Sequence, residues 1–192
     1  RSPVLRFVNT RGSLNGFDFN GVQDAVLMQG CELNGTTRSF YTGISLNPDS
    51  NVASGWSAFL VNSKIQDFST GLNLFSQDPR LVNNHSSFLL DSTTFLRGGI
   101  AVRVSYAQRG MSLTVKDSNF SDYGDGVYLY SRYLYYRGPG DEAFTRIQGS
   151  KFIDAGLWLL QGSIFNIPSQ HRVEILDSHF EAGEDRTALD IV

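Results

Sequence analysis

A short pattern, glycine followed by alternating apolar residues, recurs along the chain and restricts it to very few folds. Each copy reads Gly, apolar, any residue, apolar, and alanine replaces the glycine in the last copy. Internal repeats of this length are typical of solenoids, in which each repeat packs only on its neighbours. The copies recur every 27 to 32 residues and are Gly16–Phe19, Gly43–Leu46, Gly71–Leu74, Gly99–Val102, Gly126–Leu129, Gly156–Leu159 and Ala188–Ile191.

A second pattern precedes the glycine copies. It reads apolar, any, apolar, two linking residues, a small polar residue, any residue, and an apolar anchor, as in Leu113–Phe120 and Val173–Phe180. Alternation with period two indicates short strands with one buried face. Strands this short cannot form a sheet alone, so we expect successive coils to stack in parallel. The prediction is an all-β parallel β-helix of about seven rungs, a single domain over 1–192. Looser copies end at Leu33, Ile65, Phe95 and Phe152.

The residues before each anchor form two chemically uniform series. The third residue before the anchor is one that tolerates a left-handed backbone, which predicts a sharp corner. The series is Gly30, Asn62, Ser92, Asp117, Gly149 and Asp177. The next position holds small residues that can hydrogen-bond at a bend. They are Cys31, Ser63, Thr93, Ser118, Ser150 and Ser178, so Cys31, the one cysteine, is interpreted as a structural equivalent of serine.

The segment 118–131, SNFSDYGDGVYLYS, resembles the repeat of the pectin-lyase-like superfamily. The resemblance implies a right-handed parallel β-helix. Members of this superfamily include polysaccharide lyases, glycosidases, epimerases, phage tailspikes and autotransporter passengers, so the fold alone does not choose an activity. No complete catalytic motif of its enzymes can be matched here. We expect no cofactor, with calcium as the exception if the chain is a lyase.

Charge and hydropathy exclude some classes of partner. The net charge of −3 gives no basic field for nucleic acid. No apolar run is long enough to span a bilayer. Because both ends fall inside the repeat, we expect a section of a longer protein, or ends that partners cover. The expected location is extracellular or on the cell surface.

Aromatic residues and arginines gather toward the C-terminal half. Alignment on the glycines places Ala101, Tyr128 and Trp158 in one outward column, and Arg103 and Tyr130 in the next. A long insertion at 131–143 adds further members of both kinds. Aromatic rings stack on sugars and arginine pairs with acidic groups, which predicts a binding site for an acidic polysaccharide. The alternative is that the aromatics hold the insertion down. The candidate ligand-binding residues are Arg103, Tyr128, Tyr130, Trp158, Arg132, Tyr135 and Arg137.

Three aspartates occupy equivalent positions two residues after an anchor: Asp67, Asp122 and Asp154. Paired carboxylates can bind calcium or act as nucleophile and acid in glycoside cleavage. Aspartate at a turn also hydrogen-bonds its own backbone, which is the structural alternative. These three residues are the candidate catalytic set.

An apolar stripe is predicted on the outer face of the N-terminal half. If Leu113 and Val115 point inward, the register directs the side chains of Leu27, Phe59, Val61 and Leu89 outward. An exposed apolar patch usually marks a partner or a covering segment. A loop folding back over the stripe is the alternative.

Three functions are compatible with these features. The first, which we favour, is a surface module, similar to adhesins and passengers, that binds polysaccharide or a partner protein. The second is a polysaccharide lyase or glycoside hydrolase that uses the aspartates. The third is an architectural segment of a trimeric fibre, associated through the apolar stripe or with flanking domains of the same protein.

Overall fold

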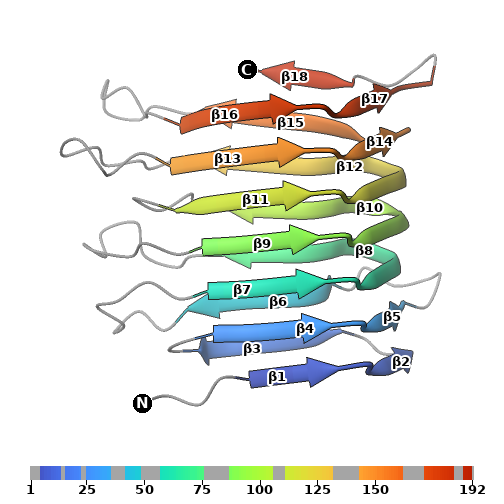
Figure 1. Cartoon of the computed structure of the whole chain (residues 1–192), viewed down its shortest axis with the longest axis vertical. Helices are drawn as coiled ribbons and strands as arrows, with labels where there is room; N and C mark the ends of the chain where they lie inside the picture. The colour runs from blue at the N-terminus through green and yellow to red at the C-terminus, as the bar shows by residue number, and fades with distance from the viewer. Residues whose placement is uncertain are drawn as a thin grey trace.

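The chain folds into a parallel β-solenoid (Figure 1). The structure, a computed structural model, describes residues 5–13, 16–22, 25–35, 42–48, 57–75, 87–105, 111–131, 143–161, 171–183 and 188–191. Over these ranges it contains strands and no helix. All strand pairs are parallel, and each strand pairs with its counterpart in the next coil, as the repeat predicted.

One face of the solenoid is a seven-stranded sheet that takes one strand from each successive coil (Figure 1). Side chains alternate between buried and half-buried along these strands, because period two directs every second residue into the core. In spatial order the strands are β1 (Leu5–Val8), β4 (Ala25–Gln29), β7 (Ser57–Val61), β9 (Ser87–Asp91), β11 (Ser112–Lys116), β13 (Ala143–Gln148) and β16 (His171–Leu176).

The remaining strands form a second, eleven-stranded sheet that bends around the other side of the core. In the middle coils the chain passes through this bend inside one long strand, which is longer than the few residues the sequence predicted. The strands are β2 (Arg11–Ser13), β3 (Phe17–Val22), β5 (Glu32–Asn34), β6 (Thr42–Pro48), β8 (Lys64–Phe75), β10 (Thr94–Ser105), β12 (Asn119–Ser131), β14 (Lys151–Ile153), β15 (Gly156–Gln161), β17 (His179–Glu181) and β18 (Leu189–Ile191).

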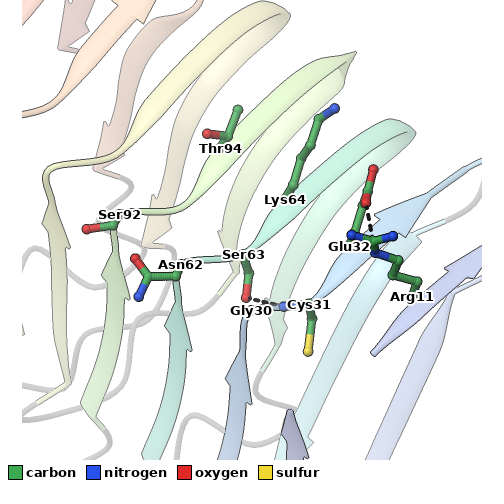
Figure 2. A pocket seen from close by; sticks show the side chains of 9 residues that line it. All are labelled: Arg11, Gly30, Cys31, Glu32, Asn62, Ser63, Lys64, Ser92 and Thr94. Atoms are coloured by element: carbon green, nitrogen blue, oxygen red, sulfur yellow. Dashed lines mark hydrogen bonds and ion pairs between the residues drawn. The ribbon is translucent and has the colours of Figure 1, made fainter. Parts of the chain in front are cut away.

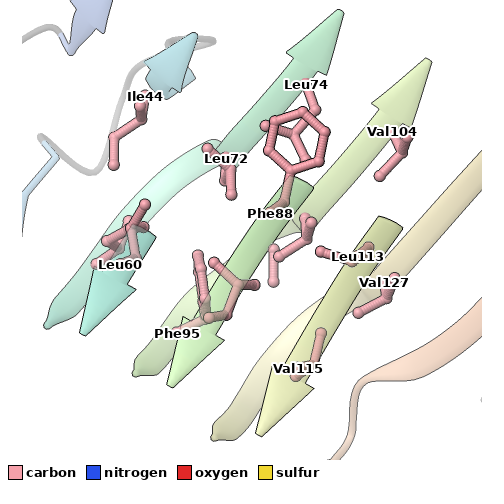
Figure 3. Packing of buried hydrophobic residues seen from close by; sticks show 14 of the residues in the cluster. Ile44, Leu60, Leu72, Leu74, Phe88, Phe95, Val104, Leu113, Val115 and Val127 are labelled. Carbon is pink, nitrogen blue, oxygen red and sulfur yellow. The ribbon is translucent and has the colours of Figure 1, made fainter. Parts of the chain in front are cut away.

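The core fills the space between the two sheets with columns of aliphatic and aromatic side chains (Figure 3). The predicted anchors form one such column, with Leu33 paired to Ile65 and each later anchor paired to the next. The rings of the phenylalanine anchors stack nearly parallel, with centroids 5.2 Å apart for Phe95 and Phe120 and 4.5 Å apart for Phe120 and Phe152. Each such ring pair adds about 0.5–1.5 kcal/mol beyond the burial of its area.

The predicted left-handed corners are confirmed. All six residues named for them have positive φ, from 47° at Asp117 to 62° at Gly30, and Asn9 adds an equivalent corner in the first coil. Amide and short acidic side chains suit this backbone because they hydrogen-bond locally, and glycine suits it because it lacks Cβ. These corners turn the chain from the first sheet into the second.

The predicted role of the small residues after the corners is also confirmed. Cys31, Ser63, Thr93, Ser118 and Ser150 are buried at 4% exposure or less. In several coils the hydroxyl accepts a hydrogen bond from the backbone N–H of its counterpart in the preceding coil, at 3.1–3.2 Å. The same hydroxyl donates to the carbonyl two residues earlier, as in Ser118 to Lys116 at 2.8 Å. The column forms a hydrogen-bonded ladder inside the solenoid, from Cys31 to Ser63 and from Thr93 through Ser118 and Ser150 to Ser178.

One part of the predicted register is wrong. The counterpart of Leu72 is Val102 rather than Ile100, and Arg103 pairs with Asn73. The repeat copy in this coil therefore begins at Ala101 rather than Gly99. A slip of two residues preserves the alternation of apolar residues, so that alternation cannot reveal it. Ala101, which the sequence predicted to point outward, is fully buried. The correction moves Arg103 into the same outward column as Tyr128 and Trp158.

Candidate binding surfaces

The most distinctive outward feature of the second sheet is a column of one arginine and two aromatic rings. Arg103, Tyr128 and Trp158 occupy consecutive coils at the same register position of β10, β12 and β15. The Tyr128 and Trp158 rings stack with centroids 4.4 Å apart and planes tilted by 27°. The Arg103 guanidinium carbon lies 5.9 Å from the centroid of the Tyr128 ring. We call these three residues the Arg–aromatic column.

The stacking determines which part of each ring is offered to a ligand. Arg103 lies on one face of Tyr128 and Trp158 on the other, so both faces of the phenol ring are occupied. The face-on stacking of Tyr128 on a sugar that the sequence suggested is therefore not available. Ring edges carry partial positive charge and attract oxygen atoms. With the exposed guanidinium of Arg103, the column presents a positively polarised strip to solvent.

Tyr130 belongs to a neighbouring column of the same sheet. The backbone of Tyr130 pairs with Leu160 in β15 and with Ser105 in β10, one column away from Arg103. Arg132, Tyr135 and Arg137 lie outside the described residues, as does most of the insertion predicted at 131–143.

The three aspartates lie at the second bend of their coils. Asp67, Asp122 and Asp154 all have positive φ, between 50° and 63°. Arg97 occupies the same position in the coil between Asp67 and Asp122, also with positive φ (56°), and it donates two hydrogen bonds to Asp67, of 2.8 and 2.9 Å. Asp154 accepts a hydrogen bond of 2.8 Å from the backbone N–H of Gly183 in the next coil. The contacts of Asp67 and Asp154 join neighbouring coils, whereas the structural alternative supposed hydrogen bonds to the aspartate's own backbone.

The predicted apolar stripe is in register on the outer face of the first sheet. Leu27 pairs with Phe59 and Phe59 with Leu89, while Ala58 and Leu60 point into the core. Leu27, Phe59, Val61 and Leu89 are half-buried rather than fully exposed. The outward orientation is thus as predicted, and the apolar area at the surface is smaller than a fully exposed stripe would give.

The same column becomes ionic toward the C-terminus. Arg146 donates hydrogen bonds of 2.8 and 3.0 Å to Glu174, which also pairs with Arg172. The hydrogen bond from Arg146 and the neighbouring charge of Arg172 lower the pKa of Glu174 below its usual value. The guanidinium groups of Arg146 and Arg172 also lie within 5.7 Å of the Phe144 ring centroid. This face therefore carries an arginine–aromatic group whose charge is already partly neutralised.

Sequence reasoning missed a polar groove along the first corner of the N-terminal coils (Figure 2). We call it the corner groove; its volume is about 430 Å³. The sequence analysis identified some of its lining residues as corners or as the small residues that follow them, and did not single out the others. The lining residues are Arg11, Gly30, Cys31, Glu32, Asn62, Ser63, Lys64, Ser92 and Thr94.

Comparison with known proteins gives no match: no family model, no curated protein and no solved structure matches this chain. Within the described ranges, no three His, Cys, Asp or Glu side chains are grouped so that they could hold a metal ion. Across the same part of the chain, no helix is long and apolar enough to cross a membrane. The fold class of the chain is an all-β parallel β-solenoid.

Proposed function

We propose that this solenoid is a non-catalytic module that binds an acidic polysaccharide through the Arg–aromatic column. The observation that carries the proposal is the alignment of an exposed guanidinium and two stacked rings on one outward column. A guanidinium binds carboxylate or sulfate in a bidentate manner, and the positively polarised ring edges favour sugar oxygens.

The spacing of the column supports a linear ligand. Neighbouring strands of a sheet lie about 4.8 Å apart, so the three side chains repeat along the solenoid axis at nearly the same interval. A polysaccharide that runs along this axis meets one side chain of the column in each coil. Rigid strands also hold these groups in position before binding, which reduces the entropy lost on association.

The proposal includes membership of the pectin-lyase-like superfamily and an extracellular or cell-surface location, in the manner of adhesins and passengers. The segment 118–131 supports membership of the superfamily. An acidic polysaccharide as ligand is compatible with the extracellular or cell-surface location. The competing enzymatic function would need Asp67, Asp122 and Asp154 as reactive carboxylates. The hydrogen bonds of Asp67 to Arg97 and of Asp154 to Gly183 favour a structural role for two of them.

A partner protein, or other copies of the chain in a trimeric fibre, is the second candidate ligand. The specific observation in its favour is the continuous register of Leu27, Phe59 and Leu89 on the first sheet. Light scattering at high protein concentration tests it. A species larger than a monomer that Phe59→Ser returns to monomer would favour this function.

Incubation with a panel of acidic and neutral polysaccharides tests the main proposal. We expect retention of the protein in gels that contain an acidic polymer, without shortening of that polymer. New reducing ends without new ultraviolet absorbance would indicate hydrolysis, and new absorbance of unsaturated uronates would indicate a lyase. Either result, if abolished by Asp122→Asn or Asp154→Asn in a folded protein, would replace binding by catalysis as the function.

A further inference from the structure

The corner groove runs past the corner residues of three successive coils, Gly30, Asn62 and Ser92. Gly30 is the corner residue of its coil, with φ of 62°, and a Cβ placed there would come within 2.4 Å of Asn9 Oδ1. The neighbouring corner residues, Asn62 and Ser92, keep exposed polar side chains. Cys31 and Ser63 form part of the groove floor. The backbone N–H of Cys31 donates a hydrogen bond of 3.2 Å to the Ser63 hydroxyl, and this bond belongs to the internal ladder. The floor is therefore rigid.

One wall of the groove is a column of polar side chains. Arg11, Glu32, Lys64 and Thr94 share one register position in successive coils (Figure 2). Arg11 forms an ion pair of 3.5 Å with Glu32, which neutralises both charges. Among the residues that the structure describes, Lys64 has no ion-pair partner. Lys64 therefore leaves one uncompensated positive charge in the groove, although the whole chain carries a net charge of −3.

The other groups of the groove suit hydroxyl-rich ligands. Asn62 offers an amide that both donates and accepts hydrogen bonds, and Thr94 offers a hydroxyl. Ser92 donates its hydroxyl proton to Asp91 at 2.9 Å, and its oxygen remains able to accept. Asn62 lies on one coil, and Ser92 and Thr94 lie on the next coil, about 4.8 Å further along the axis. A linear ligand along the solenoid axis would meet them in turn.

We propose that the corner groove is a second binding site, which takes an acidic oligosaccharide with an anionic group on Lys64. The sugar hydroxyls then bond to Asn62, Ser92 and Thr94. This site is on different strand segments from the Arg–aromatic column, and it uses none of its residues. It goes beyond the proposed function, because it assigns binding to the N-terminal coils as well.

The test uses the full chain and a short oligogalacturonate as the probe, with its methyl-esterified form as the uncharged counterpart. Loss of one charge-assisted hydrogen bond weakens affinity by on the order of tenfold. Titration calorimetry at low salt is carried out in the Trp158→Ala background, so that the Arg–aromatic column does not contribute. In that background we expect Lys64→Ala to raise the dissociation constant about tenfold. The ester should bind the Trp158→Ala protein as weakly as the acid binds the protein that also carries Lys64→Ala.

Lys151 gives a control, because it occupies the same register column as Lys64 but lies outside the groove. Its side chain is exposed, and that of Lys64 is half-buried. We expect Lys151→Ala to bind the acid as the wild-type protein does. Amide shifts on titration should move at Lys64 and Thr94 and persist in Trp158→Ala, which removes the other site. Equal losses in Lys64→Ala and Lys151→Ala, equal binding of acid and ester, or shifts that vanish in Trp158→Ala would each overturn the proposal. The last result alone would leave the proposed function of the Arg–aromatic column intact.

Discussion

The backbone N–H of Ser118 donates a hydrogen bond of 3.1 Å to the hydroxyl of Ser150, one coil further along the solenoid. Ser150 in turn donates that hydroxyl proton to the carbonyl of Gln148 at 2.9 Å. Both serines are buried, so water cannot replace either partner. The ladder thus satisfies backbone groups that the corner removes from the regular pairing between strands.

Ser150→Ala tests the ladder. The substitution leaves the Ser118 N–H buried without its acceptor, which costs about 1–3 kcal/mol. We expect chemical denaturation to show this loss in the free energy of unfolding. Ser178→Ala is the control, because Ser178 is half-buried in the last coil and water can partly replace its hydroxyl, so its loss should be smaller. Equal unfolding midpoints for Ser150→Ala and the wild-type protein would contradict this role.

Cys31→Ser tests the interpretation of the cysteine. The Cys31 thiol lies 3.6 Å from the carbonyl oxygens of Gln29 and Phe7, where other coils have a serine hydroxyl bonded to the equivalent carbonyl. We expect the serine variant to keep its free energy of unfolding within about 1 kcal/mol, because a hydroxyl restores the ladder chemistry. Cys31→Val should lose about 1–3 kcal/mol through overpacking. A serine variant as unstable as the valine variant would show that the site needs sulfur.

The corners are the part of the fold that the sequence predicted best. Gly, Asn and Asp at one position of a repeat have a single common property, tolerance of positive φ, and every named corner has it. The anchor register was equally predictable, because large apolar residues occupy one position in each coil. The lengths of the long strands were not, because Asp67, Arg97 and Asp122 turn the chain without interrupting strand pairing.

Asn62 allows a clean test of a corner, because its side chain is exposed and only its backbone conformation matters for stability. Its φ is 49°. We expect Asn62→Ala to destabilise the protein by about 1 kcal/mol, because Cβ crowds the following carbonyl in this region. Asn62→Gly should be close to neutral. Thermal or chemical unfolding measures both, and an alanine variant more stable than the glycine variant would contradict the corner assignment.

Asp125 links stability to pH. Burial raises its pKa above the usual value for aspartate. Between these two pKa values the folded state binds more protons than the unfolded state, so the free energy of unfolding falls as pH rises through this window. We expect Asp125→Asn to remove this part of the pH dependence and to be at least as stable as the wild-type protein at neutral pH. Unfolding curves at several pH values check this, and an unchanged pH profile would contradict it.

The candidate site was less predictable than the fold. Composition and outward position identified the aromatic and arginine residues. They did not predict that Arg103 pairs with Tyr128, because a two-residue slip at Gly99 preserves the alternation of apolar residues. Neither the apolar alternation nor the aromatic residues of the sequence indicate the corner groove. Its lining comes from the corners of several coils and the residues that follow them, so predicting it requires the relative positions of those coils.

The affinity of four proteins for one acidic polysaccharide tests the central claim most directly: the wild-type chain, Arg103→Gln, Trp158→Ala and Phe144→Ala. Phe144 is the matched control, since it is an outward ring beside Arg146, whose charge Glu174 neutralises. We expect Arg103→Gln and Trp158→Ala each to weaken binding on the order of tenfold, with circular dichroism unchanged. Phe144→Ala should bind as the wild-type chain does. Wild-type affinity in both Arg103→Gln and Trp158→Ala would contradict the account.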